Sequence, residues 1–146
     1  MIRLELPSLP PSSNHAYFNL KGRGRALTDV GRSYLTNVKS HLQRNHRQAM
    51  TFFEKNAPYF VVVRFYFGVL ENAGYPGKAE NRYKKLDGNN RIKLLEDALK
   101  DAGGIDDSQT LRFLWEKKQG VPERTLLWVW NLEKEKSPFD DALRTL

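Results

Sequence analysis

Three aspartates surround a short amphipathic segment in the second half of the chain. Asp87 precedes the segment Asn90–Ala102, and Asp106 and Asp107 follow it. Carboxylates without cysteine partners favour hard cations such as Mg²⁺, which takes oxygen ligands and usually binds one or two carboxylates together with phosphate oxygens. A Mg²⁺ ion beside a basic surface suits phosphodiester hydrolysis, because it activates water and neutralises the developing charge. Asp-Gly and Asp-Asp pairs are also common in plain surface turns.

The predicted helix separates these acids from one another. Its ends lie roughly 20 Å apart at 1.5 Å per residue. Asp87 and Asp107 therefore meet only if the chain beyond Gly104 folds back along the helix, or if a second chain supplies one of them. The sequence leaves both routes open. The helix also carries a polar stripe beside its apolar one, at Asn90, Lys93, Asp97 and Asp101.

Lys93 is the basic residue of this stripe. Asp97 follows it at the spacing at which opposite charges pair on a helix. Lys93 could stabilise a phosphate during its reaction. The plainer interpretation is a surface ion pair, which contributes roughly 0.3–0.5 kcal/mol. The spacing alone favours the plainer interpretation.

Hydrophobic periodicity predicts an α/β (α+β) domain with one mixed β-sheet and helices packed against it. Strands are expected at 2–6, 17–20, 59–70, 111–118 and 124–132, and helices after Thr28 and at 90–102. The strand at 59–70 is apolar at both parities, so we expect it at the centre of the sheet and covered on both sides. Gly103 is expected to end the second helix. The residues expected in the core are Val30, Tyr34, Val38, Leu42, Ile92, Leu95, Leu99, Ala102, Trp115, Trp128 and Trp130.

The composition fits a single domain over residues 1–146, with residues 133–146 as a peripheral tail. The chain has no cysteine, which excludes disulfides, thiolate zinc sites and a cysteine nucleophile. No stretch is long and apolar enough to span a membrane, and the first residues alternate like a strand rather than like a signal peptide. We therefore expect a cytoplasmic protein without a membrane partner.

The net charge of +7 comes from a surplus of Lys and Arg before residue 87. This imbalance suits a polyanion partner rather than a small-molecule substrate, although many basic domains bind no polyanion. The Gly-rich stretch 21–25 and the loop 71–85 concentrate the charge, and Tyr75 and Tyr83 in that loop could stack on unpaired bases. The candidate DNA contacts are Asn14, Lys21, Arg23, Arg25, Lys84, Lys85 and Arg91.

Four motifs, LPSLPPSSNHAYFN, RALTDVG, DGNNRIKLLEDAL and GGIDDSQ, resemble in order the RusA family of Holliday-junction resolvases. The resemblance runs from about Leu6 to Gln109. It implies a homodimeric, bacterial or phage-encoded endonuclease of DNA recombination and repair. Such an enzyme depends on Mg²⁺ or Mn²⁺ and cuts four-way DNA junctions by paired symmetrical nicks. The catalytic residues that it implies are Asp87, Asn89, Lys93 and Asp107, of which Asp87, Asn89 and Asp107 would bind the metal.

Asn89 departs from the family pattern, which has a carboxylate at that position. Its side-chain oxygen can ligate a metal but brings no charge. Three explanations stay open: the protein binds junctions without cutting them, another acid such as Asp97 or Asp106 serves instead, or Asn89 is an inactivating substitution. The hypotheses are therefore a metal-dependent junction endonuclease and a non-catalytic junction-binding protein. Charge alone would also allow an RNA-binding or protein-interaction domain.

Overall fold

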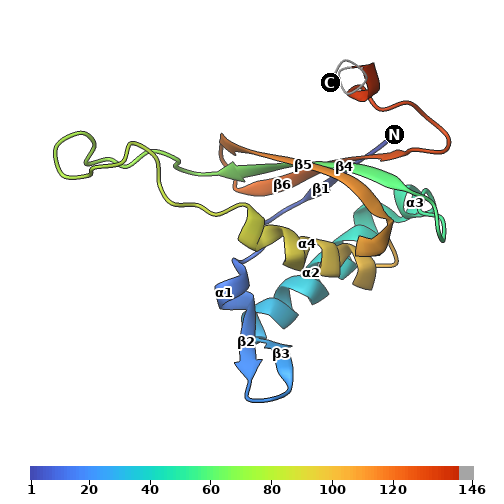
Figure 1. Cartoon of the computed structure of the whole chain (residues 1–146), viewed down its shortest axis with the longest axis horizontal. Coiled ribbons are helices and arrows are strands. Elements are labelled where there is room, and N and C mark those ends of the chain that lie inside the picture. Colours follow the sequence, from blue (N-terminus) through green and yellow to red (C-terminus); the bar gives the residue numbers. More distant parts are fainter. Residues whose placement is uncertain (142–146) are drawn as a thin grey trace.

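A mixed four-stranded sheet forms the centre of the computed structural model, which describes residues 1–141 (Figure 1). Its strands are β1 (Ile2–Leu6), β6 (Arg124–Asn131), β4 (Tyr59–Phe67) and β5 (Thr110–Gln119), side by side in that order. β4 pairs in parallel with β5, whereas the other two neighbouring pairs are antiparallel. The expected mixed sheet, with β4 in a central position, is confirmed.

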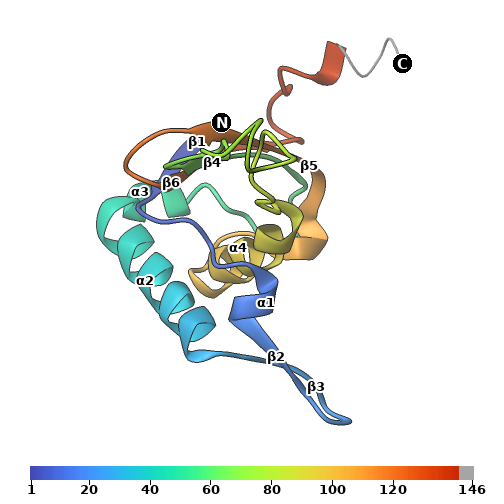
Figure 2. The ribbon, with the colours of Figure 1, turned by 90° about the vertical axis from the view of Figure 1, so that its left-hand side faces the viewer.

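Two helices cover one face of this sheet. α2 (Asp29–Asn45) and α4 (Asn89–Asp101) contact each other on the same side of the sheet in both views (Figure 1, Figure 2). Two single turns, α1 (Ser13–Ala16) and α3 (Arg47–Met50), lie at either end of α2. None of the helices within residues 1–141 could cross a membrane, because each is too short or too polar. The largest fully buried side chains are Leu4, Leu6, Val38, Leu42, Tyr59, Phe60, Val61, Val63, Phe65, Leu94, Leu95 and Leu127.

Helix α2 follows its sequence pattern except at its first turn. The Thr28 hydroxyl caps the helix by accepting a backbone N–H from the first turn. Tyr34, Val38 and Leu42 are buried as expected. Val30 is 54% exposed, so its predicted core position is wrong. The first turn is covered on the side of Gly31, which is buried against Ala16 and Leu27, and Val30 lies about 100° around the helix from that side.

Helix α4 buries a wider stripe than its period predicts. The helix contacts α2, and its buried residues share one hydrophobic core with those of the sheet, which covers more than one row of side chains. The outer positions of the predicted stripe, Ile92 and Ala102, are only partly buried. The fully covered residues of the helix are Leu94, Leu95, Ala98 and Leu99.

Neither α2 nor α4 lies over the opposite, outer face of the sheet (Figure 1). Trp128 and Trp130 lie on this face, so their predicted core positions are wrong. Trp130 stacks on Phe60 with ring centroids 5.3 Å apart, and the Arg64 guanidinium lies over Trp128. Val62, opposite Trp128 in the neighbouring strand, is half-buried. The expectation that β4 is covered on both sides therefore holds for Phe60, which Trp130 and Phe139 cover, but fails for the half-buried Val62, Arg64 and Tyr66.

The expected second strand forms outside the main sheet. β2 (Tyr17–Leu20) pairs with β3 (Gly24–Leu27) as a separate hairpin that projects from the body (Figure 1, Figure 2). Gly22 and Gly24 have φ angles of +73° and +85°, which glycine adopts without steric cost. The basic, Gly-rich stretch is therefore the tip of a projecting hairpin rather than a plain loop.

A second projection, the long arm (residues 69–86), leaves the end of β4 and returns to the start of α4. Backbone hydrogen bonds join its two sides, from the Asn72 N–H to the Arg82 carbonyl and from the Lys84 N–H to the Leu70 carbonyl. Figure 1 shows the arm extending far beyond the sheet. The polar loop predicted here is thus an extended, two-sided ribbon.

Residues 133–141 return to the outer face of the sheet. Phe139 packs edge-on against Phe60 with ring centroids 5.5 Å apart. Asp140 accepts a hydrogen bond from Arg112 of β5. The expected peripheral tail contacts the sheet in this part, while its residues 142–146 lie outside the described residues.

Gly31→Ala should destabilise the contact between α1 and α2. A Cβ at Gly31 would lie 2.5 Å from the backbone oxygen of Ala16, so the two elements would have to separate. We expect a loss of about 1–3 kcal/mol in the free energy of unfolding, measured in urea. The matched control is Gly77→Ala, whose Cβ would meet no atom closer than 3.8 Å. Equal losses in the two variants would contradict this packing.

Candidate active site

The first turn of α4 positions Asp87. Its carboxylate accepts two hydrogen bonds from Asn90, one from the backbone N–H at 3.3 Å and one from the side-chain amide at 2.6 Å. The free N–H groups at a helix start favour such an acid. Ser13 of α1 donates in turn to the Asn90 side-chain oxygen at 3.3 Å. The Pro/Ser-rich segment therefore braces Asp87 through Asn90.

The end of α4 turns the chain back along the helix. Gly103 has a φ angle of +86°. The amides of Gly103 and Gly104 bond to carbonyls of the last helical turn in the pattern of a Schellman cap. Beyond this turn, Asp107 comes within 3.5 Å of the Lys93 ammonium. The chain beyond Gly104 therefore folds back along the helix as far as Lys93, as the first of the two routes requires.

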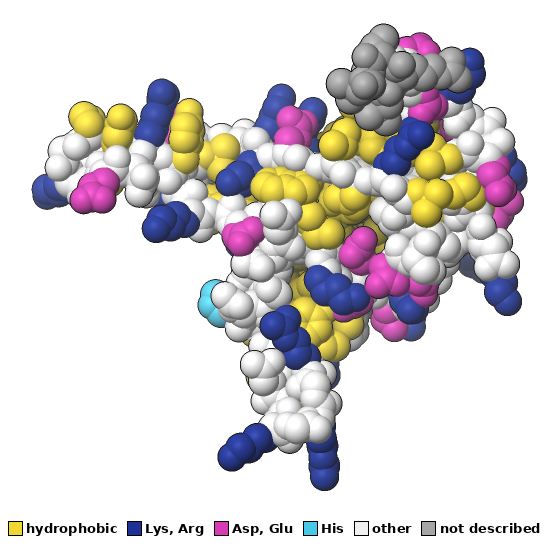
Figure 3. Space-filling model, viewed as in Figure 1, with side chains coloured by type: hydrophobic (Ala, Val, Ile, Leu, Met, Phe, Trp, Pro, Cys, Tyr) yellow, Lys and Arg dark blue, Asp and Glu magenta, His cyan; other side chains and the backbone are white. Residues whose placement is uncertain are grey.

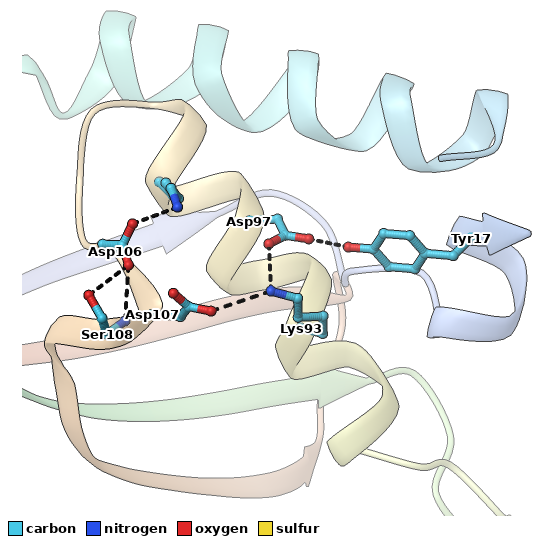
Figure 4. A network of polar contacts seen from close by, with 7 residues as sticks. Tyr17, Lys93, Asp97, Asp106, Asp107 and Ser108 are labelled. Atoms are coloured by element: carbon cyan, nitrogen blue, oxygen red, sulfur yellow. Dashed lines mark hydrogen bonds and ion pairs between the residues drawn. The ribbon is translucent and has the colours of Figure 1, made fainter. Parts of the chain in front are cut away.

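Lys93 lies between two carboxylates (Figure 4). Its ammonium is 3.0 Å from Asp97 and 3.5 Å from Asp107. The hydrogen bond to Asp97, together with the charges of both acids, raises the pKa of Lys93, so the group is charged at neutral pH. The pair expected within the helix is therefore present, and a second pair joins the helix to the segment beyond the turn.

Asp87 and Asp107 border the same face of α4. Asp87 is bonded to Asn90 and Asp107 contacts Lys93, and side chains three residues apart are neighbours on a helix. No three His, Cys, Asp or Glu side chains within residues 1–141 come together as a ready metal site. A cation on this face would rely on two carboxylates, water and the oxygens of a substrate.

The available donors suit Mg²⁺ or Mn²⁺. Asp87 and Asp107 are both exposed, and their donor atoms are oxygens. Mg²⁺ is commonly held by one or two carboxylates together with phosphate oxygens, and it keeps several waters. The residues therefore fit such an ion, and Asp87 and Asp107 would be its charged ligands.

Asn89, the third expected ligand, is held by Trp115 of β5. The Trp115 indole N–H donates to the Asn89 side-chain oxygen at 2.9 Å. The same ring lies so close to Gly88 that a Cβ there would be 2.4 Å from it. Lys117 donates to the Leu86 carbonyl at 2.9 Å. Strand β5 therefore fixes this turn, and the Asn89 oxygen already accepts one hydrogen bond.

Asp106 has a structural role beyond the turn. Its carboxylate accepts hydrogen bonds from the backbone and hydroxyl of Ser108 and lies 2.5 Å from the Lys100 ammonium. The bond from Lys100, followed by those from Ser108, holds the pKa of Asp106 well below its usual range. With both oxygens engaged, Asp106 is poorly placed to replace the carboxylate missing at position 89.

Asp97 is held on its second oxygen by Tyr17, a residue that the sequence did not single out (Figure 4). The Tyr17 hydroxyl donates to the Asp97 oxygen that does not face Lys93. Burial, and then this hydrogen bond, raises the pKa of Tyr17, so the hydroxyl remains a donor. The sequence offered one indication of this contact, because the hydroxyl of a covered tyrosine usually needs a hydrogen-bond partner. Asp97, like Asp106, is not free to replace the missing carboxylate.

The candidate DNA contacts form two exposed groups. Figure 3 shows Lys and Arg side chains on both projections, with acids on the body between them. Asn14 lies at the base of the hairpin in a hollow of about 220 Å³ that Arg25 also lines. The exposed basic residues are Lys21, Arg23 and Arg25 on the β2–β3 hairpin, and Lys84 and Lys85 where the long arm meets α4.

Arg91 differs from these residues because its guanidinium has internal partners. It donates to the Pro10 carbonyl and lies over the Phe67 ring at 5.2 Å from its centroid. Burial lowers the pKa of Arg91. The side chain therefore fastens the Pro-rich segment to the core, and its expected DNA contact stays a prediction.

Comparison with known proteins agrees with this arrangement. A search of curated proteins gives no match. The family model of endodeoxyribonuclease RusA matches residues 7–126, which include both projections and every candidate site residue. Since the match covers most of the chain, the chain belongs to the RusA family of endodeoxyribonucleases, whose activity is Holliday-junction resolution.

Proposed function

We propose that this chain is a homodimeric, divalent-metal-dependent endonuclease that cuts four-way DNA junctions by paired symmetrical nicks. The observation that carries the proposal is the turn after α4, which returns Asp107 to Lys93 on the face where Asn90 holds Asp87. This face presents two carboxylates for a metal ion and one ammonium for a phosphate.

Each charged residue of this face has a separate role. Asp87 and Asp107 would hold Mg²⁺ or Mn²⁺, which supplies an activated water and neutralises phosphate charge when bound. Lys93 adds a positive charge toward the phosphate, and its ion pairs with Asp97 and Asp107 keep that charge in place. The chain would therefore contribute two carboxylate ligands for the metal and the Lys93 ammonium for the phosphate.

The two projections supply the basic surface that a branched DNA needs. The β2–β3 hairpin and the long arm leave the body in different directions, so the face of α4 can approach a branch point between them (Figure 1). Their Lys and Arg side chains would contact phosphates, which accounts for affinity without sequence preference. Tyr75 and Tyr83 on the long arm are exposed, and their rings are available to stack on unpaired bases.

A non-catalytic junction-binding protein is the second candidate, and Asn89 is the observation that favours it. Asn89 brings no charge, and its side-chain oxygen already accepts the Trp115 indole N–H. In Asn89→Asp, one carboxylate oxygen would keep that hydrogen bond and the other would be free for a metal. Metal-dependent nicking by the unaltered chain therefore separates the two candidates, and Asn89→Asp tests whether the site itself is that of a nuclease.

The outer face of the sheet is the surface that we propose for the homodimer. Val62 and Leu114 are neighbours across β4 and β5, and Trp128 lies on the other side of Val62. Leu114 is 46% exposed. A second copy packed face to face would cover this apolar strip, and the two-fold symmetry would provide one site for each nick.

On a labelled synthetic four-way junction with Mg²⁺ or Mn²⁺, we expect Asn89→Asp to cut by paired nicks. The unaltered chain should bind the junction and cut it at least about 100-fold more slowly, because even indirect partners of a metal contribute 10–100-fold. Nicked products are measured on denaturing gels. Asn37→Asp, which adds the same charge at an exposed position of α2, is the control and should change nothing.

Two results of this experiment would contradict the proposal. If Asn89→Asp binds the junction with either metal but does not cut it, the endonuclease proposal fails and the binding protein remains. If neither form prefers the junction to a duplex, both candidates fail.

Removing the hairpin charges should weaken junction binding. The triple variant replaces Lys21, Arg23 and Arg25 by Ala, and we expect the slope of log affinity against log salt to fall by about 1 for each phosphate that the variant no longer binds. Fluorescence anisotropy at several salt concentrations measures this slope. The matched control replaces three exposed residues at the other end of α2, Arg44, Arg47 and Lys55. An equal loss of affinity in the control would show that total charge, and not the hairpin, sets the affinity.

Leu114→Asp should convert the homodimer to a monomer in sedimentation velocity, because it places a charge in the proposed interface. Leu111→Asp is the matched control, since Leu111 lies on the same strand and is 65% exposed but falls in the irregular start of the strand, outside the pairing that places Leu114 beside Val62. We expect that control to remain a dimer. A monomeric unaltered chain, or equal dissociation of both variants, would exclude this interface.

A further inference from the structure

Tyr17 lies where the basic hairpin joins the body of the protein. It is the first residue of β2 and pairs across the hairpin with Leu27, the last residue of β3. The preceding residue, Ala16, is fully buried, and its carbonyl accepts the Thr28 amide. The base of the hairpin is therefore anchored to the start of α2, and this anchoring fixes the backbone position of Tyr17.

A continuous chain of polar contacts leads from Tyr17 to the candidate active site (Figure 4). The Tyr17 hydroxyl donates to one oxygen of Asp97, and the other oxygen lies 3.0 Å from the Lys93 ammonium. Lys93 in turn reaches Asp107 at 3.5 Å. Three separate segments, β2, α4 and the stretch beyond the Gly103 turn, are thus joined through one lysine.

Lys93 depends on these partners for its position. A lysine ammonium is a point charge on a flexible four-carbon side chain, and it makes no planar, two-point contact of its own. Its side chain is largely exposed, so packing does not hold it. The orientation of the Asp97 carboxylate therefore decides where the Lys93 charge stands, and the Tyr17 hydroxyl fixes that orientation.

We propose that Tyr17 is a positioning residue that orients Lys93 toward the scissile phosphate through Asp97. Through Tyr17, DNA contact at the β2–β3 hairpin is linked to the alignment of the site. This inference rests on the proposed function, in which Lys93 contacts the phosphate. Tyr17 itself touches no reacting atom, and its effect passes entirely through Asp97.

Tyr17→Phe removes the hydroxyl and keeps the ring. Asp97 then loses its second partner, so its carboxylate can rotate and Lys93 gains alternative positions. The matched control is Tyr34→Phe. The Tyr34 hydroxyl is buried, and it finds no hydrogen-bond partner among the described residues. Both variants delete one tyrosine hydroxyl, and only the first one interrupts the chain of contacts.

The first measurement follows the Lys93 side chain directly, by NMR relaxation of the full chain with ¹⁵N-labelled lysine. Spectra are recorded free and with a four-way junction in the absence of metal. We expect the Lys93 ammonium to become more mobile in Tyr17→Phe and to stay unchanged in Tyr34→Phe. Unchanged mobility in Tyr17→Phe overturns the proposal, whether or not any form of the protein cuts DNA.

The second measurement determines kcat and KM for junction cleavage in the Asn89→Asp background. Tyr17→Phe should lower kcat about tenfold or more with KM unchanged, because a small displacement of a catalytic group is costly. It should have no further effect once Asp97→Ala has removed the intermediate partner. The proposal is contradicted if Tyr17→Phe changes only KM. It is also contradicted if Tyr17→Phe lowers kcat by the same factor whether or not Asp97→Ala is present. If Asn89→Asp does not cut, the proposed function fails, while the Lys93 mobility still decides the role of Tyr17.

Discussion

The reversal of the chain at Gly103 and Gly104 is the constraint on which the candidate site depends. A helix of the length of α4 would otherwise carry Asp107 roughly 20 Å from Asp87. The left-handed φ angle at Gly103 lets the Schellman cap close, and the chain then runs back to Lys93. Because the reversal is made by backbone hydrogen bonds, the position of Asp107 is fixed before any metal or DNA binds.

The strand that follows this reversal supports the other end of the site. β5 pairs in parallel with β4, and α4 is the crossover between them, as parallel neighbours require. Trp115 of β5 holds Asn89 through its indole N–H, and Lys117 holds the carbonyl of Leu86. One strand thus begins beside Asp107 and braces the turn that presents Asp87. The same topology places α2 and α4 on one face of the sheet, and the opposite, outer face is where we place the second subunit.

Much of this architecture could be predicted from the sequence, because alternation and helical period report directly on burial. The four strands of the main sheet, β2, both long helices, the Thr28 cap and the stop at Gly103 follow from local patterns, whereas β3 was not predicted. The predicted core positions of Trp128 and Trp130 were wrong, because a large apolar residue does not reveal which side of a sheet is covered. Tyr17 and Asp97 lie 80 residues apart, and no local pattern encodes such a contact. The family pattern identified Asp87 and Asp107, but only the fold explains how they reach one helix face.

Manganese binding, followed through the backbone amide signals, tests most directly whether the fold brings Asp87 and Asp107 together in one metal site. Mn²⁺ is paramagnetic and broadens the NMR signals of nuclei close to it. We expect residues 87–89 and 106–108 to broaden together at the lowest Mn²⁺ concentrations, and more strongly in Asn89→Asp. Broadening of only one of the two groups, or earlier broadening beside acids elsewhere such as Glu133 or Asp141, would contradict a shared site.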